Sequence, residues 1–393
     1  MDLSFTPQEQ AFRGQVRRFI REHLDPRTHR RMIEGRIPPK EEVVTWQRTL
    51  NARGWATPSW PKEHGGPGFS PVERYIFLDE LHQAPAPEPV SFNVSMIGPV
   101  LIEFGSKAQQ ERFLAPTANA DIWWAQGFSE PNAGSDLASL RTSARREGGH
   151  YIVSGHKIWQ GMAHHADWMF TLVRTDPDAP KKQMGISFLL IDLRAPGVTI
   201  RPIITMDGRH EVNEVFLDEV KVPLDCLIGE ENRGWDITKF LLSNERTGIA
   251  RIGMTKHLVR RIKRLADGDM ALLTKAAAIE AELKILEITQ LRILDAQRGS
   301  SAPDPRSSIL KLKGVELRQA ASELLVEAAG ARALEICSDD DGLCYGGPGD
   351  DGAEWLGTIM PNYAILRAAS IYGGSSEVQK TIVASTMLGL KPA

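Results

Sequence analysis

The chain has 393 residues, a hydrophobic fraction of 42%, a charged fraction of 25% and a formal net charge of -3. These values are ordinary for a globular protein, and the length is enough for two or three domains. A net charge so near zero gives no reason to expect nucleic acid or an acidic membrane as a partner.

The first residues contain no basic segment followed by an apolar run, so no secretory signal is predicted. No apolar stretch of about 18 residues is present, which argues against a membrane span. The three cysteines, at positions 226, 337 and 344, form no CxxC pair and favour reduced thiols over a disulfide framework or a zinc site. We therefore expect a cytoplasmic protein.

The N-terminal third has the periodicity of helices. After Thr6-Pro7, a good cap and first-turn pair, apolar residues recur at helical spacing at positions 12, 16, 19 and 20. The sequence Gly-Gly-Pro-Gly at residues 65–68 predicts a break between helices. We expect an α-helical domain over residues 1–120.

From about Asp121 the apolar period changes to two. Short strands are predicted at residues 151–154, 168–173, 186–191 and 198–203. This pattern predicts a small middle β-domain, a barrel or sandwich, over residues 121–232.

Long amphipathic helices return from about Gly234. They are predicted to end near Ala266, to run over 270–298 and 306–334, and to begin for the last time near Ser375. The Asp- and Gly-rich segment 338–352 is expected to be a mobile loop. The whole is predicted to be an α+β multidomain fold that ends in a four-helix bundle over residues 233–393.

Two neighbouring segments carry the most specific signal. Residues 125–136 read Ala-Gln-Gly-Phe-Ser-Glu-Pro-Asn-Ala-Gly-Ser-Asp, and residues 155–159 read Gly-His-Lys-Ile-Trp. A glycine lets a planar or phosphorylated ligand approach the main chain closely. Any four of these residues also fit a polar turn, but the unbroken run with Trp159 at this distance resembles the flavin-binding segment of the acyl-CoA dehydrogenases. The resemblance, including the α–β–α order, covers the chain from end to end.

The resemblance implies FAD as the cofactor and assigns residues to it. The matching positions are Phe128, Ser129, Gly134, Ser135, Trp159, Gln160, Gly161, Ser375 and Glu377. Many family members have Ser or Thr at the position of Gly161, where the hydroxyl reaches the flavin N5 atom, so this contact is expected to be absent. Ser375 also fits a helix cap. On the substrate side the resemblance implies Ser135, Ser243, Arg246, Gly373 and Gly374.

Glu245 is the candidate for proton transfer. On a helix its neighbours at positions 241, 242, 248 and 249 are apolar or bare, so none of them pairs with the carboxylate. Burying a charged carboxylate on the apolar face of a helix costs roughly several kcal/mol of folding free energy unless the carboxylate is paired or protonated. Burial would raise its pKa toward neutrality, as a general base for a weakly acidic C–H requires. A distant arginine partner fits the same pattern equally well.

The resemblance decides between these readings of Glu245. Most family members carry the base directly after the tyrosine of a segment that here reads Ile371-Tyr372-Gly373-Gly374, so that position holds Gly373. Another branch carries it as a Glu before an Arg, as in Glu245-Arg246. The resemblance thus implies that Glu245 removes the α-proton while hydride leaves the β-carbon for the flavin, giving a trans-2-enoyl-CoA. The family's usual acceptor is an electron-transfer flavoprotein.

Two family signatures are altered. The RxxFGxP segment has no counterpart in residues 262–271, and QxxGG has become Glu-Ala-Ala-Gly-Ala at 327–331. In the family these segments hold the ADP half of the neighbouring subunit's flavin. Their loss implies an α2β2 assembly with a related subunit, as in the large subunit of pimeloyl-CoA dehydrogenase and the steroid side-chain enzymes. A homodimer or homotetramer in which Arg260, Arg264 or Arg292 substitutes stays open.

Other functions also stay open. A non-catalytic or flavin-poor subunit of a heteromeric dehydrogenase fits the altered signatures, and a flavin oxidase or desulfinase fits the same fold. The adjacent pair His164-His165 is expected to point to opposite faces of an extended segment and to bind no metal. The sequence does not fix the length or type of the acyl chain.

Overall fold

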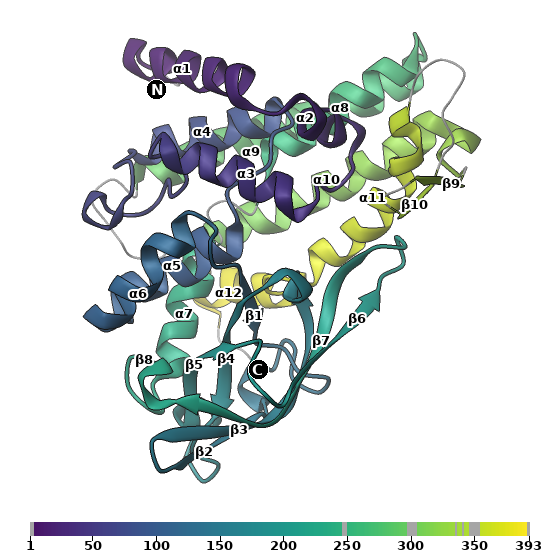
Figure 1. The fold of residues 1–393 in the computed structure, drawn as a ribbon. Helices are drawn as coiled ribbons and strands as arrows, with labels where there is room; N and C mark the ends of the chain where they lie inside the picture. Colours follow the sequence, from purple (N-terminus) through teal and green to yellow (C-terminus); the bar gives the residue numbers. More distant parts are fainter. Residues whose placement is uncertain are drawn as a thin grey trace.

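The computed structural model describes residues 4–245, 250–296, 305–334, 336–339, 342–345 and 354–390. A helical N-terminal region, a middle β-sheet and a helical C-terminal region follow one another along the chain (Figure 1). The predicted α+β fold class is therefore confirmed. None of the described helices is long and apolar enough to cross a membrane.

The N-terminal region consists mainly of α-helices. They are α1 (Pro7–His23), α2 (Pro26–Glu34), α3 (Lys40–Ala52), α4 (Pro71–Gln83), α5 (Gly98–Phe104) and α6 (Lys107–Ala118). Thr6 begins α1 as predicted, because its side chain accepts from the backbone N–H of Glu9 while the Glu9 carboxylate accepts from that of Thr6. The Gly-Gly-Pro-Gly break ends where Ser70 caps α4 in the same way. A π-helical turn, Phe92–Ile97, precedes α5.

The middle region is one twisted sheet. Its strands are β1 (Trp124–Gly127), β2 (Ser143–Glu147), β3 (His150–Gly161), β4 (Trp168–Arg174), β5 (Ile186–Asp192), β6 (Val198–Ile204), β7 (His210–Pro223) and β8 (Leu227–Ile228). The strand order is β6-β7-β3-β2-β4-β5-β8, with β1 paired in parallel to β4. The four predicted strands are present, and β3 extends well beyond its predicted end because it pairs with the long β7.

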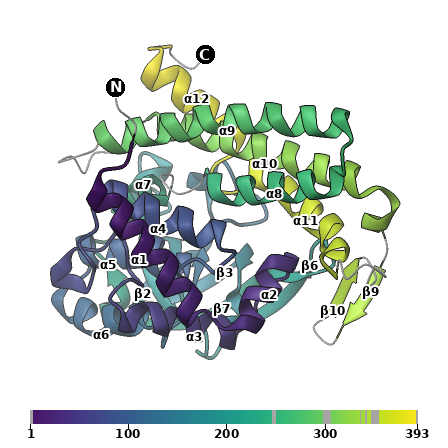
Figure 2. The ribbon, with the colours of Figure 1, turned by 90° about the horizontal axis from the view of Figure 1, so that it is seen from above.

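The C-terminal helices are α7 (Gly234–Glu245), α8 (Ile252–Ala266), α9 (Met270–Ala296), α10 (Ser307–Ala329), α11 (Ile359–Leu366) and α12 (Ser376–Met387). Helices α8, α9 and α10 pack on one another (Figure 2). The helix expected to run through Glu245 to Ala266 is interrupted, because Arg251 has a left-handed backbone with φ of 46°. Arg261 of α8 is buried against the N-terminal region near Gly35.

The segment expected to be a loop contains regular structure. Strands β9 (Ile336–Asp339) and β10 (Gly342–Tyr345) form an antiparallel pair. The expectation was wrong there because an Asp-Gly sequence between short β-favouring runs is also a hairpin signal. Residues 340–341 and 346–352 of the predicted segment lie outside the described residues.

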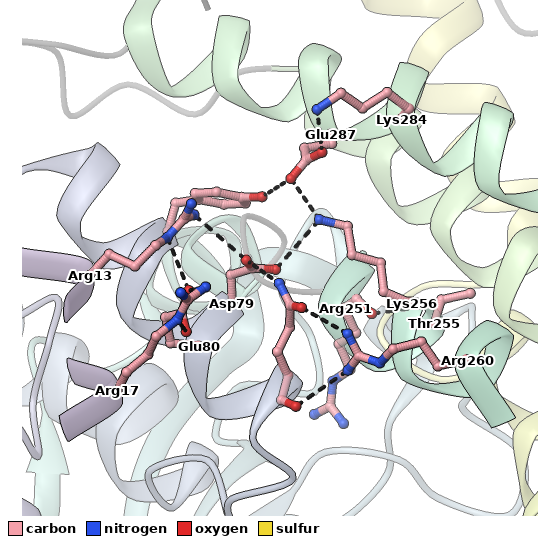
Figure 3. Close-up of polar contacts among 12 residues, drawn as sticks. Arg13, Arg17, Asp79, Glu80, Arg251, Thr255, Lys256, Arg260, Lys284 and Glu287 are labelled. Atoms are coloured by element: carbon pink, nitrogen blue, oxygen red, sulfur yellow. Dashed lines mark hydrogen bonds and ion pairs between the residues drawn. The ribbon is translucent and has the colours of Figure 1, made fainter. Parts of the chain in front are cut away.

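A buried ionic network joins the two helical regions (Figure 3). Glu80 on α4 is paired with arginines of α1, and Lys256 of α8 lies 3.8 Å from Asp79 and 2.7 Å from Glu287 of α9. Burial alone would raise the pKa of Glu287, but hydrogen bonds from Lys256 and Tyr75 hold that pKa at about 2. The network fixes α8 against α4 and α9.

Candidate functional site

A buried lysine on β3 binds the first residues of the loop from Phe128 to Asp136. Lys157 on β3 is fully buried, and its Nζ atom donates to Phe128 O at 3.2 Å, to Glu130 Oε1 at 2.9 Å and to Leu172 O at 2.8 Å. An ammonium group has three N–H donors, so each has an acceptor. The lysine therefore fixes the first residues of the loop to the strands beneath.

Glu130 completes this clamp. Its carboxylate also accepts from the backbone N–H groups of Arg141 at 2.6 Å and Thr142 at 2.9 Å. Burial lowers the pKa of Lys157 to about 8, although the charge and hydrogen bond of Glu130 oppose the shift. The lysine consequently stays mainly protonated at neutral pH. Burial alone would raise the pKa of Glu130, but the charge of Lys157 and these hydrogen bonds hold it below its usual value.

The upper part of the loop is open. Ser129 O accepts from the Ile158 N–H at 3.0 Å, and Gly134 and Ser135 are exposed beyond the turn. A Cβ atom at Gly134 would have no neighbour within 4 Å. The ring of Phe128, in contrast, is buried edge-on against Phe170 and Phe188, so this residue offers its backbone rather than its ring to a ligand.

Trp159 is a large aromatic residue in a strained and exposed position. Its φ is 70°, its relative exposure is 58%, and it sits where the pairing of β3 with β7 shifts register. A left-handed backbone at a bulky residue costs on the order of 1–3 kcal/mol and persists only where neighbours enforce it. Bulges of this kind redirect a side chain, here toward solvent.

The two residues after Trp159 are closely constrained. Gln160 is buried, its Nε2 donates to Ile158 O at 2.8 Å, and its Oε1 has no hydrogen-bond partner in the described part of the chain. A Cβ atom at Gly161 would lie 2.8 Å from Cζ of Phe92. The ring of Phe92 therefore occupies the space that a serine or threonine would need.

The adjacent histidines behave differently from the expectation. Residues Ala163–His165 form a 3-10 turn rather than an extended segment, so the rings of His164 and His165 lie together at 4.0 Å. His164 also stacks on His210 at 3.9 Å, and burial together with these neighbours lowers the pKa of His164 to about 4. Among the residues with described side chains, no group of three or more His, Cys, Asp and Glu residues is placed to bind a metal.

The segment from Tyr372 to Ser375, which carries other predicted site residues, lies directly before α12. Gly373 and Gly374 both have left-handed backbones, with φ of 62° and 87°. The buried Lys311 of α10 donates to Tyr372 O and, at 2.6 Å, to Gly374 O. Ser375 caps α12 by accepting from Val378 N at 3.4 Å, and Glu377 is exposed in the first turn.

The predicted base lies at the end of α7. The helix extends to Glu245, but the side chains of Ser243 and Glu245 and the whole of Arg246 lie outside the described residues. Their roles stay predictions. Lys157, Glu130 and Lys311 were not assigned a role from the sequence. Lys157 and Glu130 lie within the two sequence motifs described above. Their opposite charges were the signal from which their contact could have been predicted.

Known protein families match the same three regions of the chain. Family profiles described as the N-terminal, middle and C-terminal domains of acyl-CoA dehydrogenase match residues 6–121, 125–220 and 232–388. All three regions built above are therefore matched within one family.

Individual relatives match over nearly the whole chain. Acyl-CoA dehydrogenase IpdE1 of Mycobacterium tuberculosis is 34% identical over 361 residues, covering 89% of this chain and 88% of its own. Acyl-CoA dehydrogenase FadE29 of the same organism is 32% identical over 406 residues, covering 100% and 98%.

Two solved structures have closely similar folds. The Tcur3481-Tcur3483 steroid ACAD has a TM-score of 0.87 at 28% identity, with both chains fully covered. The ChsE4-ChsE5 complex of Mycobacterium tuberculosis has a TM-score of 0.84 at 29% identity, again with both chains fully covered.

Proposed function

Because the chain belongs to the acyl-CoA dehydrogenase family, we propose that it converts an acyl-CoA thioester to the trans-2-enoyl-CoA with FAD as cofactor. The observation that carries this proposal is the exposed, left-handed Trp159 beside the clamped loop from Phe128. A protein maintains such strain where it serves a site.

The residues present fit a planar, hydrogen-bonding cofactor. Trp159 offers an exposed ring, Gly134 leaves open space above the loop, and Gln160 Oε1 is a buried acceptor without a partner in the described part of the chain. The residues that would hold FAD are Phe128 and Ser129 through their backbone, and Gly134, Ser135, Trp159, Gln160, Gly161, Ser375 and Glu377. When bound, FAD supplies the two-electron oxidant.

Glu245 would take the α-proton of the thioester. It is the last described residue of α7. A carboxylate can act as a general base toward a weakly acidic C–H. Gly373 supplies no side chain at the other position where the family carries its base. Ser243, Arg246 and Gly374 would surround the same thioester.

The assembly proposed is an α2β2 complex with a related subunit, with an electron-transfer flavoprotein as acceptor. Glu327 stands where the family motif has Gln and is ion-paired with Lys275 at 2.6 Å. A carboxylate there repels a diphosphate instead of donating to it. Arg260 is already bound to Gln83 and is thus a poor substitute. The similar structure of ChsE4-ChsE5 is itself that of a complex. The same observations favour, as the alternative, a non-catalytic or flavin-poor subunit.

One experiment separates these functions. The chain is purified alone and after co-expression with a sequence-related partner, and flavin absorbance is recorded before and after acyl-CoA addition, with the product identified by mass spectrometry. We expect bleaching and an enoyl-CoA product from the co-expressed complex, with less flavin in the chain alone. Flavin that no acyl-CoA reduces contradicts catalysis by this chain. A complex that keeps its full rate after Glu245→Gln contradicts Glu245 as the base.

A further inference from the structure

One face of α10 covers the wall formed by Tyr372 to Gly374. Lys311, Gly314 and Arg318 are spaced by three and four residues and so share this face. Lys311 binds the carbonyls of Tyr372 and Gly374, and a Cβ atom at Gly314 would lie 2.7 Å from Cα of Ala250. This face therefore lies between the glycine segment and Ala250, which precedes α8.

Arg318 is the member of this face whose donors are not satisfied. It is 4% exposed, and its Nη2 reaches Tyr372 Oη at 3.4 Å, a long contact for a hydrogen bond. Its Nε is buried without any partner in the described part of the chain. A guanidinium has five N–H donors and stays charged in proteins, so burial in this state is costly unless an acceptor arrives.

Glu88, a carboxylate whose charge acts on Arg318, is already shared. Glu88 lies 2.7 Å from His82 Nε2 and 3.7 Å from Arg251 Nε. Burial alone would raise the pKa of Glu88, but the charges of Arg251 and His82 hold it well below its usual value. The charges of Arg251 and Arg318 both act on this one carboxylate, so Glu88 is not reserved for Arg318.

Apolar surface leads to this charge. The ring of Tyr372 and the side chain of Ile371 are 48% and 69% exposed, directly before Gly373. An acyl chain lying on these groups would bring its far end toward the guanidinium. A carboxylate is the acceptor that matches an arginine best, because it takes two parallel N–H bonds.

We propose that Arg318 binds a carboxylate on the acyl group of the substrate, so that the preferred thioesters are those of dicarboxylic or otherwise carboxylated acids. This inference rests on the proposed function for the identity of the site. The alternative is that Arg318 only supports Tyr372.

The test compares matched thioesters in the holo-complex. Hexanoyl-, octanoyl- and decanoyl-CoA are paired with adipoyl-, suberoyl- and sebacoyl-CoA, with the monomethyl ester of suberoyl-CoA as the uncharged oxygen control. Dissociation constants come from calorimetry and kcat/KM values from flavin bleaching. We expect at least one carboxylated ester to bind about 10-fold or more tightly than its methyl-ended and methyl-ester counterparts.

Variants assign the preference to the residue. Arg318→Met removes the charge and should abolish the preference while binding of the methyl-ended esters changes little; Arg318→Lys should keep part of it. Arg21→Met, an exposed arginine on α1, should keep all of it. Equal binding of charged and uncharged esters by the parent, or a full preference in either Arg318 variant, overturns the inference. If Arg318→Met does not fold, the parent and Arg318→Lys decide. Absence of flavin reduction by every thioester contradicts the proposed function instead, since the calorimetric preference is independent of turnover.

Discussion

The two walls of the candidate site differ in how their buried cations are satisfied. Lys157 behind the loop from Phe128 has an acceptor for each of its three donors. Arg318 behind Tyr372 has one long contact and a buried Nε without a partner in the described part of the chain. A satisfied cation fixes backbone in advance, whereas an unsatisfied one is stabilised only when a ligand supplies the acceptor.

This difference indicates a division of labour. A loop that binds the same cofactor in every turnover benefits from being rigid, because the entropic cost of ordering the loop is then incurred during folding and not during binding. A wall that selects among substrates gains discrimination when the wrong ligand leaves polar groups without partners. The loop wall has the first design and the α10 wall has the second.

The largest expected effect concerns the base. Glu245→Gln keeps the shape and removes the proton acceptor, so acyl-CoA-dependent flavin reduction should fall by at least about 10²–10⁴-fold with flavin content unchanged. Rapid-mixing absorbance measures the rate, and Glu103→Gln on the exposed side of α5 is the control. A parental rate in Glu245→Gln would assign the base elsewhere.

The next effect tests the rigid wall. Lys157→Met leaves the buried Glu130 without its cation, and breaking a buried pair in this way costs about 3–5 kcal/mol. Urea unfolding measures the loss, and flavin content should fall with it. Adding Glu130→Gln removes the stranded charge and should recover part of the stability. A single variant as stable as the parent would show that the clamp does not carry the loop.

A smaller effect tests why the flavin-facing hydroxyl is absent. Gly161→Ser places a Cβ atom 2.8 Å from the Phe92 ring, and overpacking of this kind costs about 1–3 kcal/mol. The double variant with Phe92→Ala should relieve the clash, so the two changes should be non-additive in thermal unfolding. Simple additivity would mean that Phe92 does not exclude the side chain.

Much of the fold was predictable because it depends on local pattern. The change from helical to alternating periodicity near Asp121, the capping pair Thr6-Pro7 and the cap at Ser375 are all short-range signals. The motif assigned Trp159 to the candidate site, but the register shift at its left-handed backbone depends on pairing with β7, a strand distant in sequence.

The remaining features depend on tertiary contacts. The local sequence around Lys157 and Arg318 does not indicate that either side chain is buried, because lysine and arginine are usually exposed. Local spacing did not predict the left-handed backbone of Arg251, and the histidine pair was misplaced because a 3-10 turn replaced an extended segment. The expected neighbours of Glu245 at 248 and 249 lie outside the described residues.

The smallest effect asks whether backbone conformation alone shapes the substrate wall. Gly373 has φ of 62°, so Gly373→Ala should lower the free energy of unfolding by about 1–2 kcal/mol. Gly14 lies within α1, where an added Cβ atom has no neighbour within 4 Å, so Gly14→Ala should raise the free energy of unfolding by up to about 1 kcal/mol. Unfolding of both variants in parallel measures the difference. A Gly373→Ala variant as stable as the parent would mean that Lys311 holds this wall regardless of which residue follows Tyr372.

The same backbone strain limits a transfer of the base to position 373. Gly373→Glu in a Glu245→Gly background should restore only a little activity, because a glutamate side chain is disfavoured on a left-handed backbone. Flavin reduction by acyl-CoA measures that activity. A folded, flavin-loaded double variant no more active than Glu245→Gly would contradict a base position at 373.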